Sequence, residues 1–293
     1  MTRLLIYNSS AGDEDHSGED LADLLRSCGW PVRLLSNDDD DLEEVLRKAE
    51  APVFVAGGDG TVAKVVIALR ERSVPIIILP TGGSNNIARA FGITASLEDL
   101  AAGLANAQPS AFDIALAEGR WGTKFFVEAA GLGALTEALC GLDGSPDSTE
   151  EKLAMGRAAL RRQLRDAEPR AYELELDGVA TREMLLMLEV LNIPGIGPRL
   201  ELAPDAAPGD GLLHAVSLSK EQRPAFLHWL DRLEGPPPVT VRACREVRIE
   251  GGPERVRLDD PKRTTERGGA PVWFSLHPCP ATILIPVAVS RVA

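Results

Sequence analysis

Two glycine-rich segments contain the residue types that could bind a phosphate group. The first, GGDGT at 57–61, follows the apolar run PVFVA at 52–56, and the second, TGGSNN at 81–86, follows PIIIL at 75–79. Glycine allows a tight turn and lets backbone N–H groups approach an anion closely. Because the carboxyl ends of neighbouring parallel strands meet at one edge of a sheet, the pattern predicts a single phosphate-binding site built from both loops.

Polar side chains in these loops could extend such a site. Asp59 could hold a metal ion bound to phosphate oxygens, and Thr61 could cap the following helix or donate to a phosphate. Ser84 and Asn85 are short polar donors, for which helix capping is a compatible role. An ordinary tight connection is the alternative, since neither GxxxxGK[ST] nor a full GxGxxG is present.

The order of apolar patterns predicts which elements position the two loops. Strand-like runs alternate with helical patterns over the first ~107 residues, which is typical of parallel βαβ units. The predicted strands are 3–7, 31–36, 52–56 and 75–79, and the predicted helices are 17–29, 40–50, 61–70 and 96–106. We therefore expect residues 1–110 to form a doubly wound, parallel-sheet, nucleotide-binding α/β domain.

Beyond residue 110 the apolar period changes to two, which is typical of antiparallel strands. Two hairpins are predicted, one around EGRWGT at 118–123 and one around DGVATRE at 177–183. One helical insertion is expected at 151–166. The fold class is thus α/β followed by β, with residues 111–293 as an antiparallel β-sandwich whose last strands could return near the first domain.

Composition excludes several classes of protein. A net charge of −13 and a pI near 4.9 disfavour nucleic-acid binding and simple electrostatic attachment to an anionic bilayer. No run approaches the ~18 apolar residues of a membrane span, and the four cysteines form no CxxC pair. These features favour the cytoplasm. The arginines at helical spacing over 157–165 fit a solvated helix better than one that meets lipid headgroups.

Several motifs together resemble one known family. YNSSAG at 7–12, GGDGT, and P-x-G-x-x-N-x-x-A-R at 80–89 occur in the order typical of the diacylglycerol kinase, sphingosine kinase and bacterial lipid kinase family. Residues 112–135 and 192–216 resemble that family's β-domain, so the resemblance covers nearly the whole chain. It implies an ATP-dependent kinase that transfers the γ-phosphate to a hydroxyl of a diacylglycerol-like lipid, acting at the inner membrane surface, with a homodimer left open.

The resemblance also implies which residues bind ATP and Mg²⁺. The implied ATP ligands come from the turn after the first strand, the end of the second strand and both glycine loops: Asn8, Gly12, Ser36, Gly57, Gly58, Asp59, Gly60, Thr61, Gly82, Gly83, Ser84 and Asn85. A structural Mg²⁺ is implied at the DG-x-L element, on Asp210 and the backbone oxygens of Ala207 and Leu212. Such hard oxygen ligands suit this ion.

The sequence departs from the family pattern where a catalytic base is expected. The family's D-G-E corresponds to Asp259, Asp260 and Pro261, and a proline cannot accept a proton. Asp259 or Asp260 could serve instead, with Glu266 as a third candidate. Gly83 and Asn86 also replace a threonine and an aspartate of the pattern.

These departures keep two alternatives open. A nucleotide-binding regulatory protein of the same fold, without transfer activity, would tolerate all of them. NAD kinases share GGDGT and a following β-domain, but NNIAR at 85–89 favours the lipid kinases.

Overall fold

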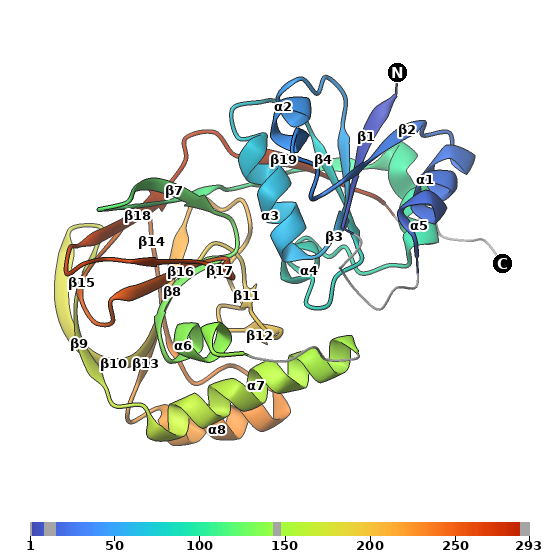
Figure 1. Cartoon of the computed structure of the whole chain (residues 1–293). Helices are drawn as coiled ribbons and strands as arrows, with labels where there is room; N and C mark the ends of the chain where they lie inside the picture. The colour runs from blue at the N-terminus through green and yellow to red at the C-terminus, as the bar shows by residue number, and fades with distance from the viewer. Residues whose placement is uncertain (1, 9–15, 143–147, 288–293) are drawn as a thin grey trace. The chain divides into compact units, whose positions relative to one another are not determined.

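The chain folds into two units, described here by a computed structural model over residues 2–8, 16–142 and 148–287 (Figure 1). The first unit comprises Met1–Phe112 and Cys279–Ala293, and the second comprises Asp113–Pro278. Gly12, an implied ATP ligand, lies outside the described residues.

A six-stranded sheet forms the first unit, in the order β2-β1-β3-β4-β19-β5. Its strands are β1 (Arg3–Tyr7), β2 (Val32–Ser36), β3 (Val53–Gly57), β4 (Ile76–Pro80), β5 (Gln108–Phe112) and β19 (Ala281–Ile285). The first four pair in parallel, as the apolar runs predict. The two central strands, β3 and β4, are apolar on both faces because helices cover both sides of the sheet.

Around this sheet the described residues form five α-helices, α1 (Gly18–Ser27), α2 (Leu42–Arg47), α3 (Asp59–Ala68), α4 (Asn86–Ala90) and α5 (Leu97–Gly103), and a short 3₁₀ helix at Leu104–Asn106. Helix α1 contacts α5, while α3 contacts α2 and α4, which is the doubly wound arrangement predicted (Figure 1). Ser17 and Asp20 form a capping box at the start of α1, and the Ser96 side chain caps α5.

The last described strand completes this sheet from the far end of the sequence. Strand β19 lies between β4, to which it is parallel, and β5, to which it is antiparallel. Its central residue, Ile283, is fully buried, like Ile78 in the neighbouring strand β4. Strand β5 therefore joins the sheet only through β19.

The second unit is built on an eleven-stranded antiparallel sheet that forms a sandwich-like core, which confirms the predicted fold class. Its strands are β6 (Ala115–Gly119), β7 (Gly122–Phe126), β8 (Ala129–Gly133), β9 (Arg170–Leu176), β10 (Val179–Leu191), β13 (Leu213–Ser219), β14 (Thr240–Cys244), β15 (Val247–Gly251), β16 (Arg255–Leu258), β17 (Asp260–Glu266) and β18 (Val272–Leu276). A separate two-stranded ribbon joins β11 (Gly195–Ile196) to β12 (Leu200–Glu201).

The second predicted hairpin has a shorter loop than the sequence indicates. Only Asp177 and Gly178 form the turn, with positive φ angles of 48° and 82°, as a two-residue hairpin turn requires. Residues 179–183 continue β10 and pair with β9. Their side chains are mostly exposed, and a solvated strand with this polar composition resembles a loop in sequence.

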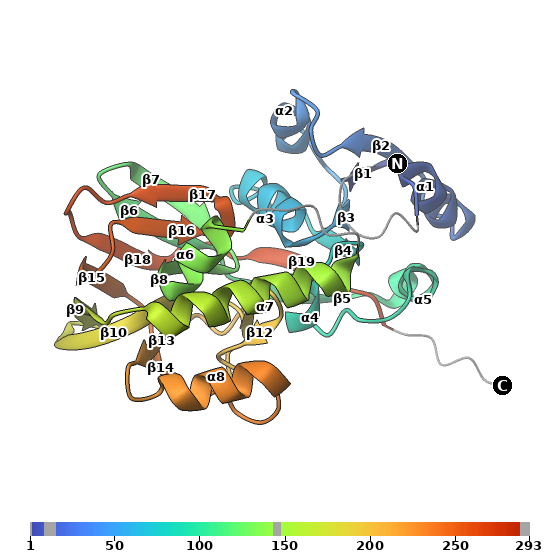
Figure 2. The ribbon, with the colours of Figure 1, turned by 60° about the horizontal axis from the view of Figure 1, so that its bottom comes forward.

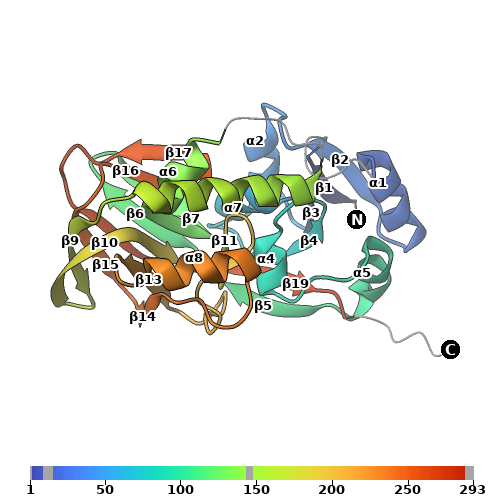
Figure 3. The same ribbon diagram turned by 90° about the horizontal axis from the view of Figure 1, so that it is seen from below.

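The part of the second unit that the structure describes contains three α-helices, where the sequence predicts one: α6 (Ala134–Cys140), α7 (Thr149–Asp166) and α8 (Arg223–Arg232). Helices α7 and α8 lie side by side (Figures 2 and 3). Within the described residues no helix is long and apolar enough to cross a membrane.

The arginine cluster on α7 is partly structural rather than simply solvated. Arg157 donates to the Pro198 carbonyl oxygen at 3.1 Å, and Arg161 donates to Leu227 at 3.2 Å and pairs with Asp231 on α8. From α8, Arg223 donates to three carbonyl oxygens at the end of α7. The contacts of Arg161 and Arg223 hold the two helices together.

Ile283→Ala should lower the free energy of unfolding of the first unit by ~2–5 kcal/mol, because it leaves a cavity in the centre of the sheet. Urea denaturation followed by circular dichroism measures this loss. The matched control is Val287→Ala, at an exposed position, with an expected change under ~0.5 kcal/mol. Equal losses in the two variants would contradict a central position for β19.

Candidate functional site

The two glycine loops contact each other directly at the carboxyl edge of the first unit's sheet. Gly58 follows β3 and Gly82 follows the neighbouring strand β4. A Cβ atom added at Gly82 would collide with Gly58, lying 2.8 Å from its backbone nitrogen. A Cβ at Gly58 would lie 3.3 Å from the Gly82 Cα. The sequence therefore predicts correctly that both loops lie at the same edge of the sheet. Glycine is needed for their close contact.

Asp59 links the two helices that begin at these loops. Its Oδ1 accepts a hydrogen bond of 2.8 Å from the backbone N–H of Ile87, in the first turn of α4. Asp59 is itself the first residue of α3, whose N-cap is Gly58. The carboxylate thus fixes the start of α4 relative to the start of α3.

Asn85 closes the second loop on itself. Its side-chain oxygen accepts from the Gly82 N–H at 3.1 Å, and its side-chain nitrogen donates to the Gly82 carbonyl oxygen at 2.6 Å. The backbone of Asn85 is left-handed, with φ of 50°. Asn85 occupies the N-cap position of α4 without a side-chain cap bond, so the predicted capping role is replaced by this loop closure.

The ends of the first two strands lie at the same edge. Asn8, after β1, donates through Nδ2 to Thr61 Oγ1 at 3.2 Å, and its backbone N–H donates to Ala56 at the end of β3. Thr61 lies inside α3 and is buried, so it does not cap the helix. Ser36 ends the adjacent strand β2 and is exposed, with its hydroxyl accepting from the Asp38 N–H. Of the other predicted residues, Gly57 ends β3, Gly60 lies in the first turn of α3, and Gly83 and Ser84 are half-buried in the second loop.

In the second unit, Asp259 is a buried structural centre. Its carboxylate accepts from the backbone N–H groups of Val127, Glu128 and Ala129 at 2.8–3.2 Å, and it pairs with Arg263 at 3.0 Å. Burial raises the pKa of Asp259, while the Arg263 charge and the three N–H donors oppose that rise. The side chain is 3% exposed, so both oxygens are occupied away from solvent.

Asp260, the next residue, has a different environment. It is half-buried at the start of β17, and its Oδ1 accepts a local hydrogen bond of 2.7 Å from the Lys262 N–H. The third candidate base, Glu266, is exposed at the other end of β17 and lies 3.9 Å from Arg255. Among the three carboxylates, Asp260 combines partial exposure with a fixed position beside Asp259.

The predicted Mg²⁺ loop is a compact turn built around Asp210. The Asp210 carboxylate accepts from the N–H groups of Ala207 at 3.0 Å and Leu212 at 2.9 Å. The Ala207 carbonyl oxygen in turn accepts from the Asp210 N–H. The described residues contain no group of three or more His, Cys, Asp or Glu side chains that could hold a metal ion. A Mg²⁺ here would rely on one carboxylate and peptide oxygens, donor types that fit this ion.

Two buried polar residues that the sequence analysis missed connect this loop to Asp259. Asp113 accepts from the Gly211 N–H at 2.8 Å, and burial raises its pKa. Asn192 donates to the carbonyl oxygens of Asp113 and Val127, both at 2.8 Å. Because Val127 also donates to Asp259, a continuous hydrogen-bond network joins the 207–212 turn to the 259–260 turn.

Both residues leave a sequence signal. Each is a polar residue next to an apolar strand, in FDIALA at 112–117 and in LEVLN at 188–192. A polar residue in such a context is buried only where it finds hydrogen-bond partners.

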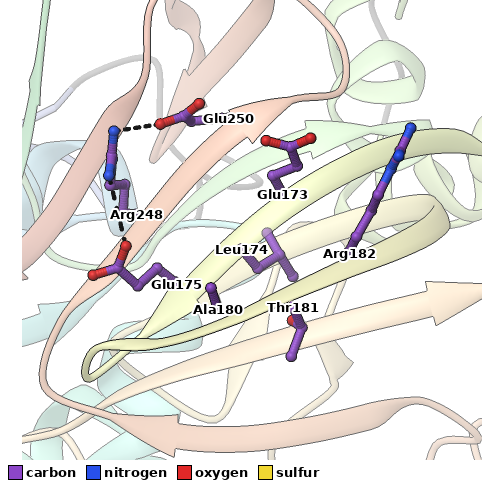
Figure 4. Close-up of a pocket in the computed structure, with 8 residues that line it drawn as sticks. All are labelled: Glu173, Leu174, Glu175, Ala180, Thr181, Arg182, Arg248 and Glu250. Atoms are coloured by element: carbon purple, nitrogen blue, oxygen red, sulfur yellow. Dashed lines mark ion pairs between the residues drawn. The ribbon is translucent and has the colours of Figure 1, made fainter.

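A surface hollow of about 420 Å³ lies elsewhere in the second unit (Figure 4). Strands β9, β10 and β15 line it with Glu173, Glu175, Arg182, Arg248 and Glu250 among others. Arg248 pairs with Glu175 and Glu250, so its charge is balanced within the hollow. None of the residues predicted to bind ATP or Mg²⁺ lines it.

Comparison with known proteins identifies this combination of units. Residues 2–117 match the diacylglycerol kinase catalytic domain, and residues 145–284 match the YegS C-terminal NAD kinase beta sandwich-like domain. A Pseudomonas syringae protein named "Probable lipid kinase YegS-like" is 32% identical over 75% of this chain and 72% of its own length. A Bacillus subtilis diacylglycerol kinase is 28% identical over 63% of this chain, a match that spans 60% of that enzyme.

A solved structure agrees with these matches at the level of the fold. A diacylglycerol kinase from Bacillus anthracis superposes with a TM-score of 0.73 at 18% identity, covering 97% of this chain and 96% of that one. The chain belongs to the diacylglycerol kinase and YegS-like lipid kinase family.

Gly82→Ala should destabilise the first unit by ~1–3 kcal/mol, since the new methyl group meets backbone atoms that cannot move aside cheaply. Gly58→Ala makes the same chemical change on the other side of the contact. It should lower the free energy of unfolding by less, because the added Cβ would lie farther from the opposing backbone. Urea denaturation of both variants measures the difference. A larger loss in Gly58→Ala would contradict the loop packing described above.

Proposed function

We propose that this protein transfers the γ-phosphate of ATP to a hydroxyl group of a diacylglycerol-like lipid. The observation that supports this proposal best is the direct contact of the two glycine loops, fixed by Asp59 and Asn85. Two loops held this rigidly offer backbone N–H groups and a helix N-terminus to a polyphosphate without reorganisation. In-line phosphoryl transfer depends mainly on such positioning and on charge neutralisation.

The ATP site would consist of the residues at this sheet edge. Asn8, Ser36 and Thr61 would contact the nucleotide from the ends of β1 and β2 and from α3, and residues 57–61 and 82–85 would surround its phosphates. Asp59 would have two roles in this proposal. It holds α4 through Ile87, and its negative charge would orient a metal ion bound to the phosphates.

We propose Asp260, rather than Asp259, as the general base for the acceptor hydroxyl. Asp259 already accepts three backbone N–H groups and the Arg263 side chain in a buried position. A base must reach the proton that it removes, which favours the half-buried Asp260. Asp259 would then position the turn that carries Asp260.

Mg²⁺ would be held in the second unit by Asp210 with the peptide oxygens of Ala207 and Leu212. When bound there, it would stabilise the 207–212 turn as a structural ion and balance the negative charge of Asp113 and Asp210. The carboxylates of Asp113 and Asp210 both accept from N–H groups of this turn, those of Gly211 and Leu212, so a cation there would reduce the repulsion between them.

One observation supports a second candidate, a nucleotide-binding regulatory protein without transfer activity. Pro261 stands where the family pattern has the catalytic glutamate, and the neighbouring Asp259 carboxylate is occupied by structural contacts. The two candidates differ in one result. Both bind ATP, but only the kinase consumes it when a lipid acceptor is present.

Asp59→Asn should abolish lipid phosphorylation while the first unit stays folded, because an asparagine oxygen can still accept from the Ile87 N–H. Asp59→Ala removes that acceptor too and should additionally lower stability by ~1–3 kcal/mol. The assay uses ATP, Mg²⁺ and mixed micelles of diacylglycerol, ceramide, sphingosine and monoacylglycerol, with thermal denaturation of each variant alongside. Wild-type protein that binds ATP but phosphorylates none of these lipids would support the regulatory candidate instead.

Asp260→Asn should lower kcat by ~10²–10⁴-fold with little change in the KM for ATP, as expected for loss of a general base. The matched control, Glu266→Gln, changes another carboxylate of the same strand and should keep kcat within about twofold of the wild type. A loss confined to Glu266→Gln would assign the base to Glu266.

A further inference from the structure

A charged pair lies fully buried in the sheet of the second unit, in a row across three neighbouring strands. Gly131 on β8 is the direct cross-strand partner of both Arg257 on β16 and Glu189 on β10. Directly paired residues share a face of the sheet, so the three positions lie in line. Arg257 and Glu189 are each 0% exposed, and their side chains meet at 2.6 Å. We refer to Gly131, Glu189 and Arg257 as the cross-strand row.

The missing side chain at Gly131 makes this pair possible. A Cβ atom there would collide with both carboxylate oxygens of Glu189. The Glu189 carboxylate therefore lies directly above the glycine on β8 and contacts Arg257 on β16, at the other side of β8. The glycine has an ordinary backbone conformation, so space rather than φ explains it.

The other end of Arg257 contacts the turn that carries the proposed base. Its Nη1 donates to the Asp259 carbonyl oxygen at 2.6 Å, while its Nη2 donates to Glu189. Asp259 has a left-handed backbone, with φ of 57°, and the register of β16 and β17 shifts at this turn. A left-handed non-glycine residue costs about 1 kcal/mol or more, so its surroundings must hold it.

Stability alone does not explain a charged pair in this position. Replacing a buried ion pair by apolar residues of similar size is often neutral or stabilising. An apolar pair could not donate to the Asp259 carbonyl oxygen, however. Arg257 provides what an apolar residue could not, which is a cationic hydrogen-bond donor fixed beside the 259–260 turn.

We propose that Arg257, held by Glu189 across Gly131, is a positioning residue for phosphoryl transfer. It fixes the backbone of Asp259, and thereby the direction in which the Asp260 carboxylate points. This inference rests on the proposed function of Asp260 as the base. The residues of the cross-strand row lie outside the sheet edge proposed to bind ATP and outside the 207–212 turn proposed to bind Mg²⁺.

The titration of Glu189 should contribute to the pH dependence of the free energy of unfolding. Burial raises the pKa of Glu189 from 4.5 to about 7, against the opposing charge of Arg257. The groups that face Glu189 are Arg257 on β16 and Tyr172 on β9, whose own pKa is raised by burial and by Glu189. A folded-state pKa above the unfolded value means that the folded protein binds the extra proton. Stability should therefore fall as the pH rises from about 4.5 to about 7, and Glu189→Gln should lack this component.

The decisive variant is the double replacement Glu189→Met/Arg257→Met, which removes both charges and leaves no unpaired one in the core. We expect a midpoint of thermal unfolding close to that of the wild type. We expect kcat for lipid phosphorylation to fall tenfold or more, with the KM for ATP within about twofold. Hydrogen exchange at the backbone amides of 258–260 should become faster. Arg257→Lys, which keeps a cationic donor, should retain a higher kcat than the double variant.

The outcomes separate this inference from the function on which it rests. An active wild type and a double variant with unchanged kcat would overturn the positioning role alone. Unchanged exchange at 258–260 would do the same, whatever the activity. A wild type that phosphorylates no lipid would overturn the proposed function and the positioning role together. A loss of kcat with a normal unfolding midpoint and faster exchange would support the inference.

Discussion

Hydrogen bonds from backbone N–H groups to carboxylate or amide oxygens hold the second glycine loop, the 207–212 turn and the 259–260 turn in place. Asp59 accepts from Ile87, Asn85 from Gly82, Asp210 from its own turn, and Asp259 from three successive residues. Each of these loops exposes backbone groups that no strand or helix can satisfy, and an unpaired buried N–H is costly. Acidic residues that the sequence marks as candidate metal ligands or bases thus also accept hydrogen bonds from the protein's own backbone.

The parts of the fold that depend on local pattern could be predicted from the sequence. Residues 53–57 and 76–80 are apolar on both faces because helices cover them, and Ser17 and Ser96 mark helix starts by capping. The glycine loops could be placed together because parallel strands end at one edge. The predictions failed where an exposed strand has the polar composition of a loop, as at 179–183. They also failed for short helices such as α6, whose apolar residues show no clear helical spacing.

The candidate site could be predicted only in its outline. Motif order identifies residues 57–61 and 259–260, but the partner of each carboxylate lies far away in sequence. Asp259 bonds to residues near 128, and Arg257 bonds to Glu189. No local pattern encodes such pairings, since they depend on strand register across the whole sheet. The roles of Asp113 and Asn192 are hidden for the same reason.

The position of β19 also affects how the protein is made. Strand β5 joins the first unit's sheet only through β19, and residues 113–280 lie between the two strands. A ribosome adding ~5–20 residues per second needs roughly 10 to 30 s to produce that stretch. During this time the edge of β4 that later pairs with β19 has no strand beside it, so the sheet of the first unit becomes complete only after the whole β-sandwich has been synthesised.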